Sequence, residues 1–160
     1  MRQSVASTAV ICRSCDNEVF WLSRWNVYWR CFNLISGHKL ATETFHQCMV
    51  RELAEELGLE SFMDYLVRNV PLAHLEYTDL SKSAQVETAY TIEAFDVEFT
   101  SEAIWDRVMA NPRVRALTER EIREGQCTDG SPVSAAILRV LDSVGWECPP
   151  HRQRSVRGTA

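Results

Sequence analysis

Three glutamates lie close together between a glycine loop and a second glycine. Glu52, Glu55 and Glu56 belong to the segment GHKLATETFHQCMVRELAEELGL, which spans residues 37–59. At about 100° per residue in a helix, the three carboxylates occupy an arc of roughly 100°. Carboxylates crowded on one side of a packed helix repel one another unless a positive charge lies among them. Hard divalent cations, which prefer oxygen ligands, would supply that charge.

The residues around the glutamates predict an amphipathic helix with defined ends. Thr44 and Gln47 have the spacing of a capping box. Gly58 stands where a left-handed C-terminal cap is expected. The apolar residues of the segment share the arc beside the carboxylates, so that arc can be buried. They are Phe45, Met49, Val50, Leu53 and Leu57.

The same segment resembles the Nudix box, Gly-x5-Glu-x7-Arg-Glu-U-x-Glu-Glu-x-Gly-U, in which U is a bulky aliphatic residue. The matching positions are Gly37, Glu43, Arg51, Glu52, Leu53, Glu55, Glu56, Gly58 and Leu59, with no slip in spacing. Seven strictly specified residues at about one in twenty each give roughly one chance in a billion per starting position. The box covers 23 of the 160 residues (37 to 59), so the substrate has to be inferred from other segments.

The resemblance implies a fold and a metal site. It implies an α/β fold, a Nudix-type α/β/α sandwich around a mixed β-sheet. It assigns Glu52, Glu55 and Glu56 as ligands of Mg²⁺ or Mn²⁺, often joined by the carbonyl of Gly37. Arg51 would then orient the glutamates by ion pairing.

The general base is left open by the resemblance. In some family members it is a glutamate of the box, which here is Glu52. In others it lies on a later loop, where the candidates are Glu98 and Glu102, of which Glu102 is preferred. We therefore expect the catalytic residues among Glu52, Glu102 and Arg51.

The aromatic segment WNVYW, residues 25–29, has two interpretations. Its rings can pack in the core or at an edge. Alternatively, Trp25, Tyr28 or Trp29 stacks on a nucleobase or another flat group of the substrate. Lys39, in the loop after Gly37, is a further candidate for a phosphate contact.

The expected function is that of a metal-dependent hydrolase. It would cleave a diphosphate bond in a nucleoside diphosphate linked to another group. Tyr77 lies 18 residues past the box, roughly where dinucleoside-polyphosphate hydrolases of the family carry a tyrosine. Two alternatives stay open. One is an isopentenyl diphosphate isomerase-like enzyme, for which Cys31 is the nearby cysteine. The other is a non-catalytic nucleotide-binding regulatory module, which the intact carboxylates argue against.

Composition predicts one globular domain. The chain has 160 residues, 46% of them hydrophobic, and a formal net charge of −5, which argues against general nucleic-acid binding. No apolar run approaches a membrane span, and no export signal is recognised, so the cytoplasm is the expected compartment. The expected partner is a small-molecule diphosphate, without membrane or nucleic acid, and a homodimer is left open. We place the domain at residues 1–148 and a flexible tail at 149–160.

The remaining elements are predicted from alternation and turn signals. Strands are expected at residues 4–14, 18–24, 31–35, 71–80, 86–99 and 114–117, and a short helix at 101–110. Ser131 and Pro132 predict the start of a last helix that runs to Val144. Residues 60–70 fit either a short helix or an extended insertion. Cys12 and Cys15 have no second cysteine pair to complete a zinc site, so they are expected as thiols in or beside a strand.

Overall fold

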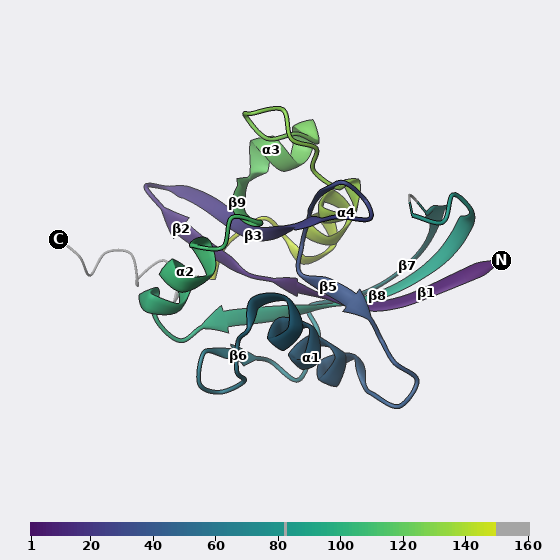
Figure 1. Cartoon of the computed structure of the whole chain (residues 1–160), viewed down its shortest axis with the longest axis horizontal. Coiled ribbons are helices and arrows are strands. Elements are labelled where there is room, and N and C mark those ends of the chain that lie inside the picture. Colours follow the sequence, from purple (N-terminus) through teal and green to yellow (C-terminus); the bar gives the residue numbers. More distant parts are fainter. Residues whose placement is uncertain (82, 150–160) are drawn as a thin grey trace.

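The computed structural model describes residues 1–81 and 83–149. In chain order, its elements are β1 (Arg2–Val10), β2 (Cys12–Cys15), β3 (Glu18–Asn26), β4 (Cys31–Asn33), β5 (Ser36–His38), α1 (Phe45–Leu57), β6 (Tyr65–Val67), β7 (Ala73–Leu80), β8 (Glu87–Phe99), α2 (Glu102–Met109), β9 (Val114–Thr118), α3 (Glu119–Glu124) and α4 (Ala135–Val144) (Figure 1). Every strand and helix predicted from the sequence has a counterpart, although several boundaries differ.

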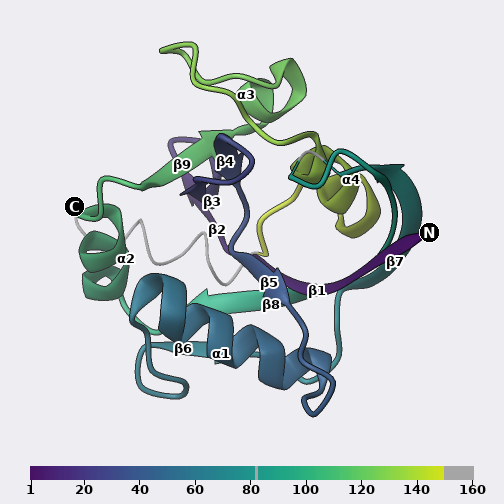
Figure 2. The ribbon, with the colours of Figure 1, turned by 45° about the vertical axis from the view of Figure 1, so that its right-hand side comes forward.

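Two sheets form the centre of the molecule. In the first, β8 pairs in parallel with β1 and antiparallel with β6 and β7, and β5 adds to the far side of β1. In the second, β3 pairs antiparallel with β2, β4 and β9. Figure 2 shows α1 and α4 on opposite sides of β1 and β8. The predicted α/β architecture around a mixed sheet is therefore confirmed.

The strand predicted over residues 4–14 is interrupted at Ile11. Ile11 is fully buried, and its carbonyl accepts a hydrogen bond from the Leu22 amide at 2.9 Å. The chain thereby passes from the first sheet to the second, so one sequence run supplies both β1 and β2. Asp16 and Asn17 close the hairpin between β2 and β3 with φ values of 51° and 64°, as a tight turn between twisted strands requires. Cys12 and Cys15 are the ends of β2.

Helix α1 has the ends that its sequence predicts. The Thr44 side chain accepts from the Gln47 amide, and the Gln47 side chain accepts from the Thr44 amide in return. Gly58 ends the helix at φ 66°, in the left-handed region. Met49 and Leu53 are fully buried, as predicted, and Cys48 is buried with them. The carboxylate-bearing helix is thus fixed to the sheet by its apolar side.

The start of the last helix was predicted wrongly. Its N-cap is Ser134, whose hydroxyl accepts from the Ala136 amide, rather than Ser131. Residues 132–134 instead run beside β4, because the Phe32 amide donates to Pro132 and the Phe32 carbonyl accepts from Ser134. This tertiary pairing holds the chain extended for three residues longer than the local signals indicate.

Residues 60–70 form an extended insertion that contains the short strand β6, and not a short helix. The tail predicted at residues 149–160 lies outside the described residues from position 150 onward. Within the described part of the chain, no helix combines the length and the apolar character needed to cross a membrane.

We expect Leu53→Ala to lower the free energy of unfolding by about 3 kcal/mol, because it empties a fully buried position between α1 and the sheet. Urea denaturation monitored by circular dichroism measures the loss. Leu57→Ala, at a partly buried position of the same helix, is the matched control and should cost clearly less. Equal losses would contradict this placement of α1.

Candidate active site

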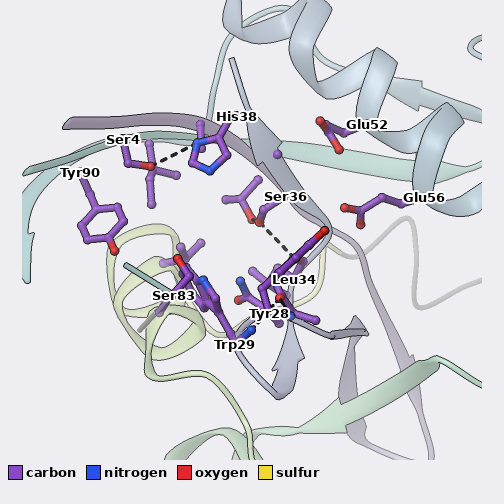
Figure 3. A pocket seen from close by; sticks show the side chains of 18 of the residues that line it. Ser4, Tyr28, Trp29, Leu34, Ser36, His38, Glu52, Glu56, Ser83 and Tyr90 are labelled. Atoms are coloured by element: carbon purple, nitrogen blue, oxygen red, sulfur yellow. Dashed lines mark hydrogen bonds between the residues drawn. The ribbon is translucent and has the colours of Figure 1, made fainter. Parts of the chain in front are cut away.

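A cavity of about 620 Å³ lies between α1, the first sheet and α4. Glu52 and Glu56 of α1 stand at one end, and Tyr90 of β8 stands at the other (Figure 3). Tyr28 and Trp29, from the turn after β3, form part of the wall between them. Polar and apolar residues from several strands complete the lining, so the cavity offers a carboxylate end and an aromatic end.

Close approach of β5 to α1 sets the position of Glu52. A Cβ atom added at Gly37 would fall on the side-chain carboxyl of Glu52. Only glycine leaves room for that carboxylate between the strand and the helix. The carbonyl of Gly37 accepts a hydrogen bond from the Cys48 thiol at 3.4 Å, which further joins β5 to α1. Glycine is therefore required at position 37, because a larger residue would collide with Glu52.

Arg51 connects the acidic side chains of the site. Its Nη2 donates to Glu43 at 2.7 Å and to the carbonyl of His38 at 2.8 Å. Its Nη1 donates to Glu52 at 2.7 Å and to Glu55 at 3.3 Å. The guanidinium thus holds the loop before α1 and two carboxylates of α1 in one arrangement, which is the ion pairing expected of a residue that orients the glutamates.

Burial and ion pairing act in opposite directions on these carboxyls. The hydrogen bond from Arg51 lowers the pKa of Glu43 to about 2. Burial raises the pKa of Glu52, although Arg51 opposes this shift. Burial raises the pKa of Glu56 to about 7, and repulsion from Glu52 and Glu55 adds to the shift. Two carboxyls inside the cavity are therefore costly to ionise unless a further positive charge approaches them.

The carboxylate end fits a divalent cation in chemistry. Glu52 and Glu56 both line the cavity, and oxygen ligands suit Mg²⁺ or Mn²⁺. Glu55 is more peripheral, because its side chain is 58% exposed and pairs with Arg51. In the described part of the chain, no three His, Cys, Asp or Glu side chains already converge as a ready metal-binding group. The ligand assignments for Gly37, Glu52, Glu55 and Glu56 stay predictions, which the burial of two of the carboxylates supports.

The structure distinguishes between the candidates for the general base. Glu52 lies in the cavity, whereas Glu98 and Glu102 are not among the residues that line it. Glu102 begins α2 and pairs with Arg13 at 3.5 Å. The structure therefore does not bring Glu102 to the carboxylate cluster, and Glu52 is the candidate with access to a ligand in the cavity.

Only some of the predicted substrate-binding residues line the cavity. Tyr28 and Trp29 line the cavity. Trp25 packs edge-on against Phe32, with ring centroids 5.1 Å apart, and lies outside the main cavity. Lys39 is half-buried, with its ammonium 5.6 Å from the centre of the Phe45 ring, and it too is not a lining residue. Trp25 thus packs within the fold, whereas stacking of Tyr28 or Trp29 on a substrate stays a prediction.

Tyr90 was not assigned from the sequence. It stacks on Tyr77 with ring centroids 5.1 Å apart and planes 23° from parallel. The guanidinium of Arg139 lies over the other ring of the pair, 4.4 Å from the centre of Tyr77. The signal for this pair was the hairpin register, since a turn centred between residues 83 and 84 places Tyr77 opposite Tyr90.

Comparison with known proteins identifies the family of the chain. The family model of the NUDIX domain matches residues 3–122, which is most of the chain. The chain belongs to the Nudix family. No curated protein sequence matches this Nudix domain closely enough to be a relative.

Solved structures similar to this Nudix domain show the same fold at low sequence identity. An Ap4A hydrolase from C. elegans is 15% identical, with a TM-score of 0.60, 89% of this chain and 96% of that chain covered. A NUDIX hydrolase from Nitrosomonas europaea is 21% identical, with a TM-score of 0.58 and coverages of 89% and 88%. The NUDIX domain of Shewanella oneidensis NrtR, complexed with ADP ribose, is 12% identical, with a TM-score of 0.56 and coverages of 89% and 86%.

The raised pKa of Glu56 predicts how the stability of the metal-free Nudix domain depends on pH. Its folded-state pKa of about 7 lies above its ordinary value of 4.5. The folded state therefore binds more protons, and stability is lost as the pH rises from about 4.5 through 7. His74, whose pKa is raised by Glu76 and Glu93, changes stability in the same direction.

We expect urea denaturation in the presence of a chelator to show a smaller stability loss between pH 5.5 and pH 8 for Glu56→Gln than for the wild type. The comparison removes the contribution of Glu56 and leaves those of Glu52 and His74. Glu119→Gln, an exposed change on α3, is the control and should retain the wild-type loss. An unchanged loss in Glu56→Gln would show that this carboxyl is ionised without cost.

Proposed function

We propose that the protein is a metal-dependent hydrolase that cleaves a diphosphate bond in a nucleoside diphosphate linked to another group. The observation that carries the proposal is the shared cavity. Glu52 and Glu56 are placed at one end of it, and stacked tyrosine rings line the other. Carboxylates suit a metal-bound diphosphate, and aromatic faces suit a nucleobase.

Arg51 and Glu52 have complementary tasks in this reaction. When bound, Mg²⁺ or Mn²⁺ would neutralise charge on the diphosphate and acidify the attacking water. Arg51 donates to Oε1 of Glu52, which leaves Oε2 without a hydrogen bond among the described residues. A carboxyl whose pKa is raised by burial is a stronger base than an exposed one. Glu52 therefore suits acceptance of a proton from water, with Arg51 fixing its orientation.

The aromatic end suits the nucleoside. Trp29, Tyr77 and Tyr90 contribute flat faces, and Ile92 and Val140 contribute apolar surface. Stacking on such rings is worth about 1–3 kcal/mol per base. The names of two similar structures mention Ap4A and ADP ribose, which supports a nucleotide substrate for this chain.

A binding module is the second candidate. Shewanella oneidensis NrtR has been crystallised with a 27mer DNA, and this chain covers 59% of that protein at 13% identity. The retained, buried carboxylates favour catalysis over binding alone. The isomerase alternative is weaker, because Cys31 is 1% exposed within β4 and does not line the cavity.

A chromatographic screen for nucleoside monophosphate formed from nucleoside diphosphate derivatives with Mg²⁺ tests the proposal. The wild type should hydrolyse at least one of them. Glu56→Gln and Glu52→Gln should each lower kcat/KM at least about 100-fold, since even residues that only support metal ligands typically contribute 10–100-fold. Glu60→Gln, an exposed change after the box, is the control. The absence of both hydrolysis and Mn²⁺ binding in the wild type would refute the hydrolase.

Gly37→Ala should weaken Mn²⁺ binding at least about tenfold, because the added methyl group displaces the carboxylate of Glu52. Titration calorimetry measures the affinity directly, without a substrate. Thr42→Ala, an exposed change in the following loop, should keep the wild-type affinity. If Gly37→Ala binds Mn²⁺ as the wild type does, Glu52 is not a ligand in the position that the structure gives it.

A further inference from the structure

A second cavity, of about 120 Å³, lies directly beside Glu56. It adjoins the main cavity, because six residues line both. These shared residues are Asn26, Tyr28, Asn33, Leu34, Ser36 and Glu56. At roughly 30 Å³ per water molecule in the liquid, its volume corresponds to about four waters, which suits a phosphate group better than a nucleobase.

Two arginines from different segments line this second cavity. Arg24 lies in β3, and Arg113 lies in the loop before β9. The Trp25 amide donates to the carbonyl of Arg113 at 2.8 Å, which holds that loop against β3. Backbone pairing thus brings the two residues to the same place, with Arg24 half-buried and Arg113 exposed.

Neither guanidinium is neutralised by a close carboxylate. Among the described residues, no ion pair within 4 Å involves Arg24 or Arg113. The Nε of Arg24 is buried and has no hydrogen-bond partner in the described part of the chain. Glu56 feels the charge of Arg24 only at longer range. A buried guanidinium donor without a partner is unfavourable, and an anion in the cavity would relieve it.

Among the described residues, the main cavity is lined by one arginine. This is Arg51, which is already bound to Glu43, Glu52 and Glu55. An anionic part of the substrate that extends past the carboxylates therefore meets Arg24 and Arg113 first. The planar fork of arginine matches phosphate oxygens in pairs.

We propose that the Arg24–Arg113 cavity binds a phosphate group that the substrate carries beyond the cleaved diphosphate. The substrate is then a nucleoside diphosphate linked to a phosphorylated group, in preference to one linked to a neutral sugar. The nucleoside lies toward Tyr77 and Tyr90, the diphosphate at Glu52 and Glu56, and the extra phosphate between the two arginines. This orientation rests on the proposed function, although the anion site itself does not.

Binding of inorganic pyrophosphate tests the anion site without any turnover. In a chelator at low ionic strength, the carboxylate end repels anions, so the arginines are the expected point of attachment. Calorimetry should give at least roughly tenfold weaker binding for Arg113→Gln, as expected for the loss of one charged hydrogen-bonding group. Arg120→Gln, an exposed arginine of α3 that pairs with Glu124, is the matched control and should bind as the wild type does.

Arg24→Gln provides the second variant, with circular dichroism to verify its fold. It should weaken pyrophosphate binding at least as much as Arg113→Gln, because its Nε is the buried donor. If Arg24→Gln alters only the stability of the protein, and pyrophosphate affinity is unchanged in both variants, Arg24 is merely a distant counter-charge for Glu56 and the anion site is overturned.

A matched substrate pair connects the site to the reaction. With ADP-ribose and ADP-ribose 1″-phosphate, Arg113→Gln should raise KM roughly tenfold for the phosphorylated compound only, with kcat retained. Hydrolysis without this selective change overturns the substrate assignment and leaves the hydrolase standing. Loss of pyrophosphate binding in both variants, in a protein that hydrolyses none of the compounds screened, retains the anion site and rejects the hydrolase.

Discussion

The ion pairs of one guanidinium determine the arrangement of the acidic site. Arg51 bonds to Glu43 in the loop, to Glu52 and Glu55 in α1, and to the backbone carbonyl of His38 at the end of β5. Without this residue, Glu43, Glu52 and Glu55 would have no ion-pair partner among the described residues and would repel one another. The pairing fixes the loop on the helix while leaving Glu52 open to the cavity. A site that needs acidic groups close together is thereby compatible with a stable fold.

The neighbouring strands set the distances between the parts of the site. The β5 strand can pass close enough to α1 only because Gly37 has no side chain where Glu52 lies. The long β8 strand pairs with β1 on one side and with β7 on the other, which brings Tyr77 and Tyr90 to the opposite end of the cavity. One sheet therefore positions both the aromatic surface and, through the helix α1 packed on it, the carboxylates.

Local sequence signals predicted the acidic helix. The features that they did not predict depend on pairing between distant segments. The capping box at Thr44 and the left-handed Gly58 act within one helix, so the sequence contains all that determines them. The register of the β7–β8 hairpin places Tyr90 in the cavity, and pairing with β4 delays the last helix until Ser134 caps it. Glu102 was a candidate by sequence position alone, and the fold directs it to Arg13.

Different parts of the cavity region carry different charge. The chain has a formal net charge of −5, and at physiological salt this charge is screened beyond roughly 8 Å, so local groups decide the binding of an anionic substrate. The carboxylate end alone would repel a diphosphate. A divalent cation held there would convert repulsion into attraction, while Arg24 and Arg113 lie just beyond it with no carboxylate within ion-pair distance among the described residues. Substrate affinity would then depend on the metal as strongly as the rate does, because the same ion removes the repulsion in the ground state and neutralises the charge that builds up in the transition state.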